Sequence, residues 1–411
     1  MPTPLTCRFC SAPLSRSFAD LGLSPLANSY VAEADLLGPE TFWPLHAYVC
    51  EQCLLVQLPP SEAPEAIFSD YAYFSSYSDS WLAHAKAYVE QVSERFALGP
   101  QHRVIEIASN DGYLLRWFVE RGVPVLGVEP AANVAEVARE NGIRTVVEFL
   151  GEATARALRE QGEGADLLVG NNVLAHVPDL NDFVTGLGIL LEPTGVLTME
   201  FPHLLRLMAE TQFDTIYHEH FSYYSLLTVE QVFAHHGLVL FDVEELPTHG
   251  GSLRVYCMHR DAAPAPTARV VELRERERAA GLGSLEAYDA FREQVLATKR
   301  SLLRFALDAK AEGRSIAAYG AAAKGNTLLN YCGVGRDFVD YVVDRSPHKQ
   351  GRYLPGTRIP IRGPEAVAET RPDYLLLLAW NLKDEIMEQM AHIREWGGRF
   401  VVPVPEARVH D

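Results

Sequence analysis

Two histidines, one glutamate and three tyrosines lie within twelve residues of the sequence, in the stretch DTIYHEHFSYYS (residues 214–225). Imidazole titrates near neutral pH, a phenol can donate a hydrogen bond, and a carboxylate can orient either group. If residues 217–220 are helical, Tyr217 and His220 share a face; if they are extended, Tyr217 and Glu219 do. Either conformation can bring a base, a carboxylate and a phenol to one pocket, so the stretch predicts acid–base chemistry.

Four of the six cysteines form two pairs, Cys7-x-x-Cys10 and Cys50-x-x-Cys53. Two-residue spacing allows both thiolates of a pair to bind one tetrahedral ion, and two such pairs complete a four-sulfur zinc site. Four unrelated thiols or a disulfide pair are the alternatives. A closed shell of four thiolates leaves no position for a substrate, so the predicted zinc ion is structural.

The bulk properties exclude several classes of partner. The chain has 411 residues, enough for two or three domains, and its net charge of −18 argues against nucleic acid or an anionic membrane surface as a partner. The first ten residues, MPTPLTCRFC, lack a signal pattern, and the longest apolar run, YLLLLAW, is too short to span a bilayer. A cytoplasmic protein is expected, in which cysteines stay reduced unless they bind metal or do redox work.

Strand-like and helix-like segments alternate from about residue 80. RVIEIASNDGYLLRWFVERG predicts a strand, a tight loop and a helix, PVLGVEPAANVAEVARENG repeats that order, and DLLVGNNVLAHV and GVLTMEF supply later strands. This alternation predicts a doubly wound parallel sheet that binds ligands at the carboxyl ends of its strands. The YHEHF motif lies beyond GVLTMEF and is expected at the same edge.

The loops at that edge contain candidate cofactor contacts. Glu129 ends the second strand, 23 residues after Glu106, where an acid can accept hydrogen bonds from ribose hydroxyls. The first loop lacks the G-x-G-x-x-G of NAD-binding proteins and is more similar to the first motif of S-adenosylmethionine-dependent methyltransferases, with Ala108 at a common glycine position. A nicotinamide cofactor and no cofactor are the alternatives. The expected cofactor contacts are Glu106, Ala108, Asn110, Asp111, Glu129, Asn171 and Asn172.

Two further segments have alternative interpretations. His176 follows the fourth predicted strand and either faces the chemistry or caps the helix expected near Asp179. The aromatic stretch FSDYAYFSSYSDSW is either a packed linker or a lid that carries Tyr71 and Tyr73 over a neighbouring site.

The C-terminal part predicts a second, smaller nucleotide-binding fold after a long helix. SIAAYGAAAKGNTLLNYC indicates a strand, a glycine turn and a helix, and VDYVVDRSPHKQG, PDYLLLLAW and RFVVPVP indicate further strands. Lys324 lies between Gly320 and Gly325, where a helix N-terminus and a cation could hold phosphate. A purely structural turn is the alternative.

Nine motifs together span nearly the whole chain: CRFC…CEQC, YAYFSSYSDS, EIASNDG, LGVEP, NNVLAHVP, FDTIYHEHFSYYS, PTHGGSLR, YGAAAKGN and PGTRIPI. They resemble the sugar C-methyltransferases of deoxysugar biosynthesis, of the type that serves tetronitrose. The resemblance implies an α/β protein in four parts. These are a zinc-binding module (1–68), a doubly wound S-adenosylmethionine-binding methyltransferase domain (69–262), a helical linker (263–313) and a smaller Rossmann-like domain that binds a nucleotide sugar (314–411).

The same resemblance implies methylation at C3 of a nucleotide-linked 4-keto-deoxy sugar, with dTDP as the expected nucleotide, through a base-generated enolate and with inversion at the methyl group. The implied catalytic residues are Tyr71, His176, Tyr217, Glu219 and His220, with His220 as the base. The expected substrate contacts are Tyr73, His249, Tyr319, Lys324 and Asn326. An NAD(P)-dependent oxidoreductase and a non-catalytic nucleotide-sugar-binding protein are the alternatives, and a monomer is expected.

Overall fold

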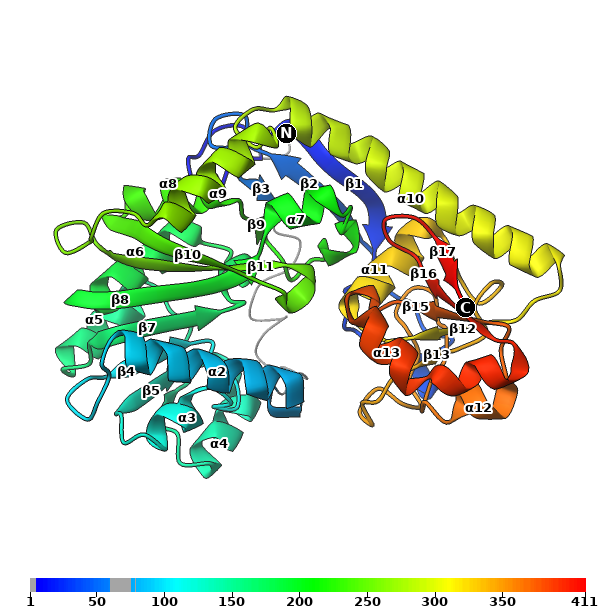
Figure 1. Ribbon diagram of the computed structural model, residues 1–411, viewed down its shortest axis with the longest axis horizontal. Coiled ribbons are helices and arrows are strands. Elements are labelled where there is room, and N and C mark those ends of the chain that lie inside the picture. Colours follow the sequence, from blue (N-terminus) through cyan, green and yellow to red (C-terminus); the bar gives the residue numbers. More distant parts are fainter. Residues whose placement is uncertain (1–4, 60–74, 78) are drawn as a thin grey trace.

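Three β-sheets organise the chain in the computed structural model, which describes residues 5–59, 75–77 and 79–411 (Figure 1). Tyr71 and Tyr73 lie outside these ranges. The predicted order of an N-terminal module, a central doubly wound domain and a smaller C-terminal Rossmann-like domain is confirmed. No helix in the described ranges is long and apolar enough to cross a membrane.

The N-terminal sheet has four antiparallel strands, in the order β1 (Arg16–Ser24), β2 (Trp43–Val49), β3 (Val56–Gln57) and β9 (Ser222–Tyr223). The fourth strand comes from the motif-bearing stretch in the middle of the chain. Val56 pairs with Tyr223 and Gln57 with Ser222, so the N-terminal module is completed by the residues that directly follow His220 and Phe221.

The central sheet has seven strands in the order β10-β11-β8-β7-β4-β5-β6. Five are parallel: β4 (Val104–Ile107), β5 (Val125–Val128), β6 (Thr145–Val146), β7 (Ala165–Asn171) and β8 (Leu191–Pro202); β11 (Ser252–His259) runs antiparallel between β8 and β10 (Leu238–Leu246). The strand order reverses between β4 and β7, which is the switch point where ligands bind in such sheets.

Helices cover both faces of this sheet, which is why its inner strands are apolar without alternation. On one face α2 (Asp79–Arg95), α3 (Leu115–Val119) and α4 (Ala132–Glu140) pack on residues such as Leu167 and Val169. On the other face α5 (Glu152–Glu160), α6 (Leu180–Leu190), α8 (Leu226–His235) and α9 (Ala268–Ala279) pack on residues such as Leu168. Adjacent strand residues therefore enter different cores.

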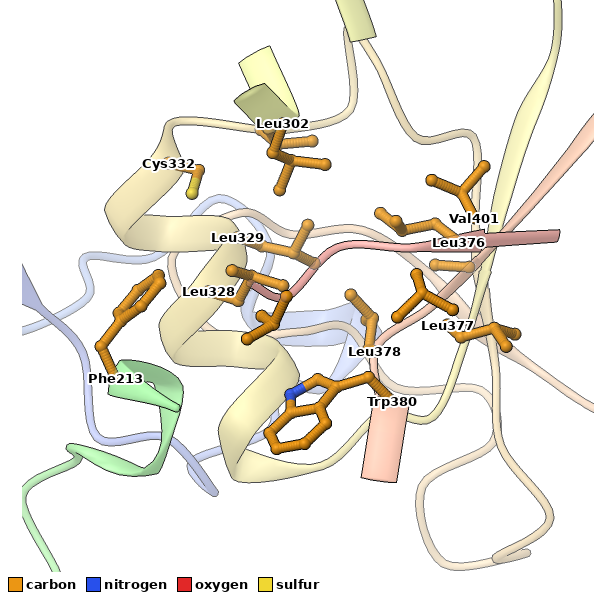
Figure 2. Packing of buried hydrophobic residues seen from close by; sticks show 14 of the residues in the cluster. Phe213, Leu302, Leu328, Leu329, Cys332, Leu376, Leu377, Leu378, Trp380 and Val401 are labelled. Atoms are coloured by element: carbon orange, nitrogen blue, oxygen red, sulfur yellow. The ribbon is translucent and has the colours of Figure 1, made fainter. Parts of the chain in front are cut away.

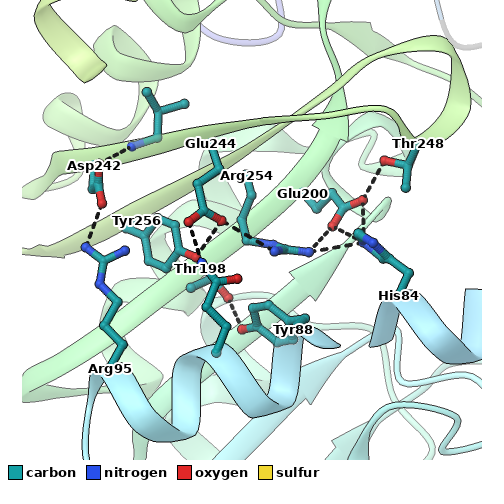
Figure 3. Close-up of polar contacts among 12 residues, drawn as sticks. His84, Tyr88, Arg95, Thr198, Glu200, Asp242, Glu244, Thr248, Arg254 and Tyr256 are labelled. Atoms are coloured by element: carbon teal, nitrogen blue, oxygen red, sulfur yellow. Dashed lines mark hydrogen bonds and ion pairs between the residues drawn. The ribbon is translucent and has the colours of Figure 1, made fainter. Parts of the chain in front are cut away.

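Buried polar groups fasten α2 to the sheet (Figure 3). Tyr88 and Thr198 share a hydrogen bond of 2.6 Å between their hydroxyl oxygens. Glu200 of β8 is fully buried and accepts hydrogen bonds from Arg254 of β11 (2.6 Å) and from His84 of α2 (2.9 Å). Burial alone would raise the pKa of Glu200, but these partners outweigh it and lower the pKa to about 2, so the charge is kept inside the protein.

The C-terminal sheet has the order β14-β13-β12-β15-β16-β17 and is parallel except at its last strand. Its strands are β12 (Ile316–Tyr319), β13 (Val342–Val343), β14 (Ile361–Arg362), β15 (Tyr374–Leu377), β16 (Arg399–Val402) and β17 (Arg408–His410), and its helices are α11 (Ala323–Cys332), α12 (Ala366–Thr370) and α13 (Lys383–Gln389). Figure 2 shows Phe213 of the central domain within this core, next to α11. The two domains therefore share apolar packing.

The predicted linker contains two helices, α9 and α10 (Glu286–Ala311). In Figure 1 the long α10 starts near the N-terminal strands and runs along the C-terminal lobe. Phe18 of β1 stacks on Phe291 of α10, with ring centroids 4.6 Å apart. The N-terminal module therefore contacts the connection between the two larger domains as well as the central domain itself.

Candidate active site

His220 is held by hydrogen bonds at both of its ring nitrogens. Nδ1 lies 3.0 Å from the carbonyl oxygen of Thr215, and Nε2 lies 2.7 Å from the Tyr217 hydroxyl. A carbonyl oxygen can only accept, so in the neutral ring Nδ1 carries the hydrogen and Nε2 carries the lone pair. The Tyr217 hydroxyl therefore donates to Nε2. The backbone forms a turn in which His220 N donates to Tyr217 O (2.9 Å), so the alternative in which Tyr217 and His220 share a face is the one found.

His176 lies beside this ring. It ends a short 3-10 helix (Leu174–His176) after β7, and its ring meets His220 edge-on at a centroid distance of 4.7 Å. Phe221 N donates to Ala175 O (2.7 Å), which fixes the two histidine-bearing loops together. Asp179, not His176, caps α6 by accepting from Asp182 N, so the capping role expected as an alternative for His176 is excluded.

Burial keeps both imidazoles neutral. Desolvation lowers the pKa of His176 to about 4 and that of His220 well below its ordinary value; nearby His176, Lys324 and His249 lower the latter further. A neutral His220 carries a lone pair on Nε2 at neutral pH, where the Tyr217 hydroxyl donates to it. The positive charge of Lys324, which contributes to lowering the pKa of His220, favours any negative charge that develops close to the ring.

Glu219 has its hydrogen-bond partner in the N-terminal module. Its Oε1 accepts a hydrogen bond of 2.8 Å from Asn28 Nδ2, in the N-terminal module, and burial raises the pKa of its carboxyl group. The group that orients His220 is therefore the Thr215 carbonyl, and the Glu219 carboxylate is oriented by Asn28. Asn28 is 191 residues away in the sequence and carries no local motif, so sequence reasoning missed it.

A very small cavity lies against His220, and a larger crevice lies between the two larger domains. A cavity of about 10 Å³, bounded by Thr215, Ser222 and Tyr223, lies against the ring and has room for no more than one water molecule. A larger crevice of about 630 Å³ lies between Arg206 of the central domain and Trp380 of the C-terminal domain. Its described lining includes none of the predicted catalytic residues.

The predicted cofactor edge is built around Glu129. Its Oε2 accepts from Asn110 N and its Oε1 from Ala131 N, both at 2.9 Å, which aims the carboxylate at the carboxyl ends of the strands. Among the described residues, Asp111 Oδ1, Ser109 Oγ and Asn172 Oδ1 are buried without a hydrogen-bond partner. Such a set of acceptors suits a nucleoside or amino-acid ligand, which brings several donors to one edge.

Glu106 and Asn171 lie deeper at this edge. Glu106 is fully buried at the end of β4, and burial raises its pKa well above the ordinary value, although nearby Tyr113 opposes that shift. Asn171 ends β7 and is also buried. The two residues therefore lie near the carboxyl ends of β4 and β7, which are neighbouring parallel strands, and their contact with a cofactor stays a prediction.

Left-handed backbone shapes the loops at the edge. Ala108, Asn110 and Asn172 have φ values of 56°, 51° and 55°. Ala108 thus occupies a conformation that favours glycine, which explains why a glycine is common at its position in the motif. Ser75 N donates to Asn110 Oδ1 (2.9 Å), so the segment before α2 is fastened to this loop.

A chain of contacts joins the two larger domains beside the histidines. Asn172 Nδ2 lies 3.2 Å from Nε2 of His249, whose own φ is 55°. Lys324 of α11 donates to His249 O (3.0 Å), and its ammonium lies 5.2 Å from the centroid of the Trp380 ring. Trp380 in turn donates to Asp214 Oδ2 (2.6 Å). His249 and Lys324, both predicted substrate contacts, therefore lie where the domains meet.

Of the three other predicted substrate contacts, Tyr73 lies outside the described residues, and Tyr319 and Asn326 have partners elsewhere. The Tyr319 hydroxyl donates to Gln389 Oε1 (3.3 Å), and Asn326 Oδ1 accepts from Asn330 within α11 (3.1 Å). The structure does not join either side chain to the histidines. Sequence reasoning also missed Glu200 and Arg254, although a buried acid and a buried arginine in apolar strands are themselves a signal of a paired network.

The four paired cysteines form one cluster. One sulfur from each of Cys7, Cys10, Cys50 and Cys53 lies within 4.8 Å of all the others, and all six cysteines of the chain are free thiols. The disulfide alternative is therefore excluded. Gln57 Nε2 donates to Cys7 Sγ (3.1 Å), a contact that would stabilise a thiolate. Four sulfurs around one point fit a closed, structural zinc site.

Three family models match successive parts of the chain: a zinc binding domain at residues 7–68, a methyltransferase domain at residues 81–243 and a C-methyltransferase C-terminal domain at residues 247–405. The C-methyltransferase NovU from Streptomyces niveus is 37% identical over 406 residues, which is 98% of this chain and 96% of that protein. A ubiquinone biosynthesis O-methyltransferase from Chelativorans sp. (strain BNC1) is 31% identical over 96 residues, covering 23% of this chain and 38% of that protein. Among solved structures, the PH0226 protein from Pyrococcus horikoshii OT3 aligns with a TM-score of 0.38 and 15% identity, covering 47% of this chain and 97% of that one.

We expect one zinc ion per chain in purified protein. Cys50→Ser should lose the metal and lower the free energy of unfolding by several kcal/mol, because zinc binding to such sites is coupled to folding. Metal analysis and urea unfolding measure the two effects. Cys257→Ser, which removes a buried thiol of β11 outside the cluster, is the control and should keep its zinc. A zinc-free parent protein would contradict the assignment.

Acid should destabilise the protein through His176. Its pKa is lowered to about 4 in the folded chain, whereas an unfolded histidine titrates near about 6.5. Between these values the unfolded state binds more protons, so this contribution to stability is complete above about pH 6.5 and is lost as pH falls toward 4. His176→Asn should therefore lose less free energy of unfolding between pH 7 and pH 4.5, by up to about 2 kcal/mol. Urea unfolding across this pH range measures the slope, and a His176→Asn protein with the parent slope would contradict the assignment.

Proposed function

The chain belongs to the C-methyltransferase family, and we propose that it transfers a methyl group from S-adenosylmethionine to C3 of a nucleotide-linked 4-keto-deoxy sugar, with a dTDP sugar as substrate. The observation that carries this proposal is the His220 ring, which holds a lone pair on Nε2 beside the Tyr217 hydroxyl and His176. A neutral base with a neighbouring hydrogen-bond donor suits removal of a proton next to a ketone.

The cofactor edge fits S-adenosylmethionine, which supplies an electrophilic methyl group when bound. Each Glu129 oxygen already accepts one backbone hydrogen bond and keeps a lone pair for a ribose hydroxyl. The unpartnered Asp111 Oδ1 and Asn172 Oδ1 would accept from the remaining donors of the ligand. His176 follows Asn171 and Asn172 by only a few residues, so the cofactor edge and the histidines are parts of one site.

Methylation of a ring carbon requires that carbon to become a nucleophile. His220 Nε2 takes the C3 proton, and the electron pair left on C3 is delocalised onto the C4 oxygen as an enolate. The C3–methyl bond then forms from the face opposite the departing sulfur, which inverts the methyl group and restores the ketone at C4. The proton on His220 is released to solvent afterwards. His176 and Tyr217 are the donors available to the enolate oxygen.

Tyr217 has two roles in this scheme. In the free protein its hydroxyl occupies Nε2 of His220. We propose that a bound 4-keto sugar turns the hydroxyl toward the C4 oxygen, which releases Nε2 for the proton and supplies a donor to the enolate at the same time. Glu219, held by Asn28, accepts a hydrogen bond from a substituent of the sugar in the same proposal.

The nucleotide is proposed to bind at the C-terminal sheet, which repeats the arrangement of the cofactor edge. Asp344 follows β13, and its Oδ2 accepts from Ala321 N (2.9 Å), as Glu129 accepts from Asn110 N in the central domain. Lys324 lies in the first turn of the following helix, where it could face a diphosphate. The parallel between the two edges supports one nucleoside at each.

The two other expected classes are less well supported. The family models that match residues 81–243 and 247–405 are methyltransferase models, which favours methyl transfer over hydride transfer. A non-catalytic sugar-binding protein has no need of a neutral imidazole held in one tautomer by a carbonyl oxygen.

Glu129→Ala should weaken the binding of S-adenosylmethionine by roughly 1–3 kcal/mol, because it removes the acceptor expected to hold the ribose and leaves two buried backbone donors unpaired. Isothermal titration calorimetry measures the change. The matched control is Asp344→Ala, the corresponding acid of the other domain, which should leave this affinity unchanged. If both variants lose the same affinity for S-adenosylmethionine, Glu129 has no specific role in cofactor binding.

His220→Asn should abolish both exchange of the C3 hydrogen and methylation, with a rate deficit on the order of 10²–10⁴. Exchange is followed by NMR in deuterated water with S-adenosylhomocysteine, which has no methyl group to transfer. Methylation is followed with ¹³C-methyl-labelled S-adenosylmethionine, whose label should couple to C3. Tyr217→Phe should slow both steps less, because one donor is lost while the base remains.

The control for that comparison is His259→Asn, which removes a histidine that bonds to Leu191 O at the far end of β11. A His220→Asn enzyme that methylates within a few-fold of the parent would exclude His220 as the base and make His176 the next candidate. A parent enzyme that methylates no 4-keto sugar would refute the substrate assignment.

A further inference from the structure

Arg8 lies inside the first cysteine pair, directly after Cys7, and its side chain contacts both the zinc module and the central domain. One terminal nitrogen, Nη1, donates to Pro178 O (2.8 Å) and approaches Val177 O (3.4 Å). The other, Nη2, donates to Leu58 O. The guanidinium carbon lies 5.3 Å from the centroid of the Phe221 ring. One side chain thus contacts three segments that are far apart in the sequence.

Two of these segments carry the histidines of the candidate site. Val177 and Pro178 follow His176, and Phe221 follows His220. Phe221 is also the point where the segments meet, because its N–H donates to Ala175 O (2.7 Å) and its carbonyl accepts from Leu58 N (3.0 Å). The guanidinium therefore holds together the two loops that carry His176 and His220, whose ring centroids lie 4.7 Å apart.

The backbone of Arg8 is fixed from the zinc side. Its N–H donates to Gln57 Oε1 (2.9 Å), and the Gln57 amide donates to Cys7 Sγ. Its carbonyl oxygen accepts from Asn181 of α6 (3.3 Å). A closed four-sulfur site fixes the conformation of the Cys7–Cys10 turn. Metal binding would therefore also fix the backbone position of Arg8 within that turn.

We propose that Arg8 is a positioning residue for the His176–His220 pair, and that the zinc module contributes to catalysis by holding Arg8 in place. The guanidinium is suited to this task because it is planar and presents its donors in a fixed fork, which can hold Leu58 O and Pro178 O at the same time while its face rests on Phe221. This inference rests on the proposed roles of the two histidines.

Arg8→Lys tests the proposal, because lysine keeps the charge but offers a single ammonium group in place of the fork. We expect the variant to keep one zinc ion and to bind S-adenosylmethionine with parental affinity, while kcat falls about 10- to 100-fold and KM for the sugar changes little. In the parent, ¹⁵N-histidine NMR should show His220 with hydrogen on Nδ1. In Arg8→Lys, the His220 and His176 signals should shift or broaden.

The matched control is Arg16→Lys, in the same module, whose guanidinium pairs with Asp289 of α10 instead. It should leave kcat and the histidine signals as in the parent. A kcat of Arg8→Lys within about twofold of the parent, with unchanged histidine signals, would overturn the proposal.

If Arg8→Lys loses zinc or does not fold, Phe221→Leu tests the proposal instead. This variant removes the aromatic ring that the guanidinium contacts and leaves the cysteines unchanged. The same loss of kcat and the same shift of the His176 and His220 signals are expected; parental values would overturn the proposal. An error in the proposed reaction would appear in the methylation assay of the parent protein. The NMR comparison needs no substrate, so it would still show whether Arg8 positions the two histidines.

Discussion

Residues 213–223 are held by all three parts of the protein, and the arrangement of the site depends on that. Phe213 packs edge-on against Tyr331 of the C-terminal domain at a centroid distance of 5.2 Å, and Asp214 accepts from Trp380. At the other end, Tyr223 pairs with β3 of the N-terminal module. A stretch fixed at both ends has few backbone conformations left, so the carbonyl of Thr215 can determine which nitrogen of His220 carries the lone pair.

The site combines low solvent access with the positive charge of Lys324. Burial is the main cause of the low pKa of His220, and Lys324, which comes from the other domain, lowers it further. A group whose conjugate acid has a low pKa is a weak base in water, but the charge that lowers this pKa also lowers the energy of an enolate formed next to it. The cost of burying these groups is compatible with folding because each has a specific partner, such as His249 O for the Lys324 ammonium.

Sequence patterns predicted the parts of the fold that depend on local order. Two-residue cysteine spacing predicted the metal cluster, and alternating strands and helices predicted the doubly wound sheet with Glu129 at its edge. Contacts across domains could not be predicted in this way. Asn28 reaches Glu219 from 191 residues away, and nothing in a polar residue within a loop indicates which carboxylate it will meet. The tautomer of His220 depends on a backbone carbonyl, which every residue has, so no residue type could have predicted it.

Strand β9 completes the N-terminal sheet but comes from the middle of the chain, and this has a consequence for biosynthesis. The ribosome makes β1, β2 and β3 first, whereas β9, their last neighbour, is made only after most of the central domain. During that interval β3 presents an open edge with unpaired backbone groups, of the kind that promotes pairing between chains. Early metal capture by the nascent cysteines would keep this sheet in its native register while it waits. Synthesis of the protein under zinc limitation is therefore expected to produce aggregates seeded at the N-terminal sheet, although the four-cysteine cluster lies outside the two larger domains.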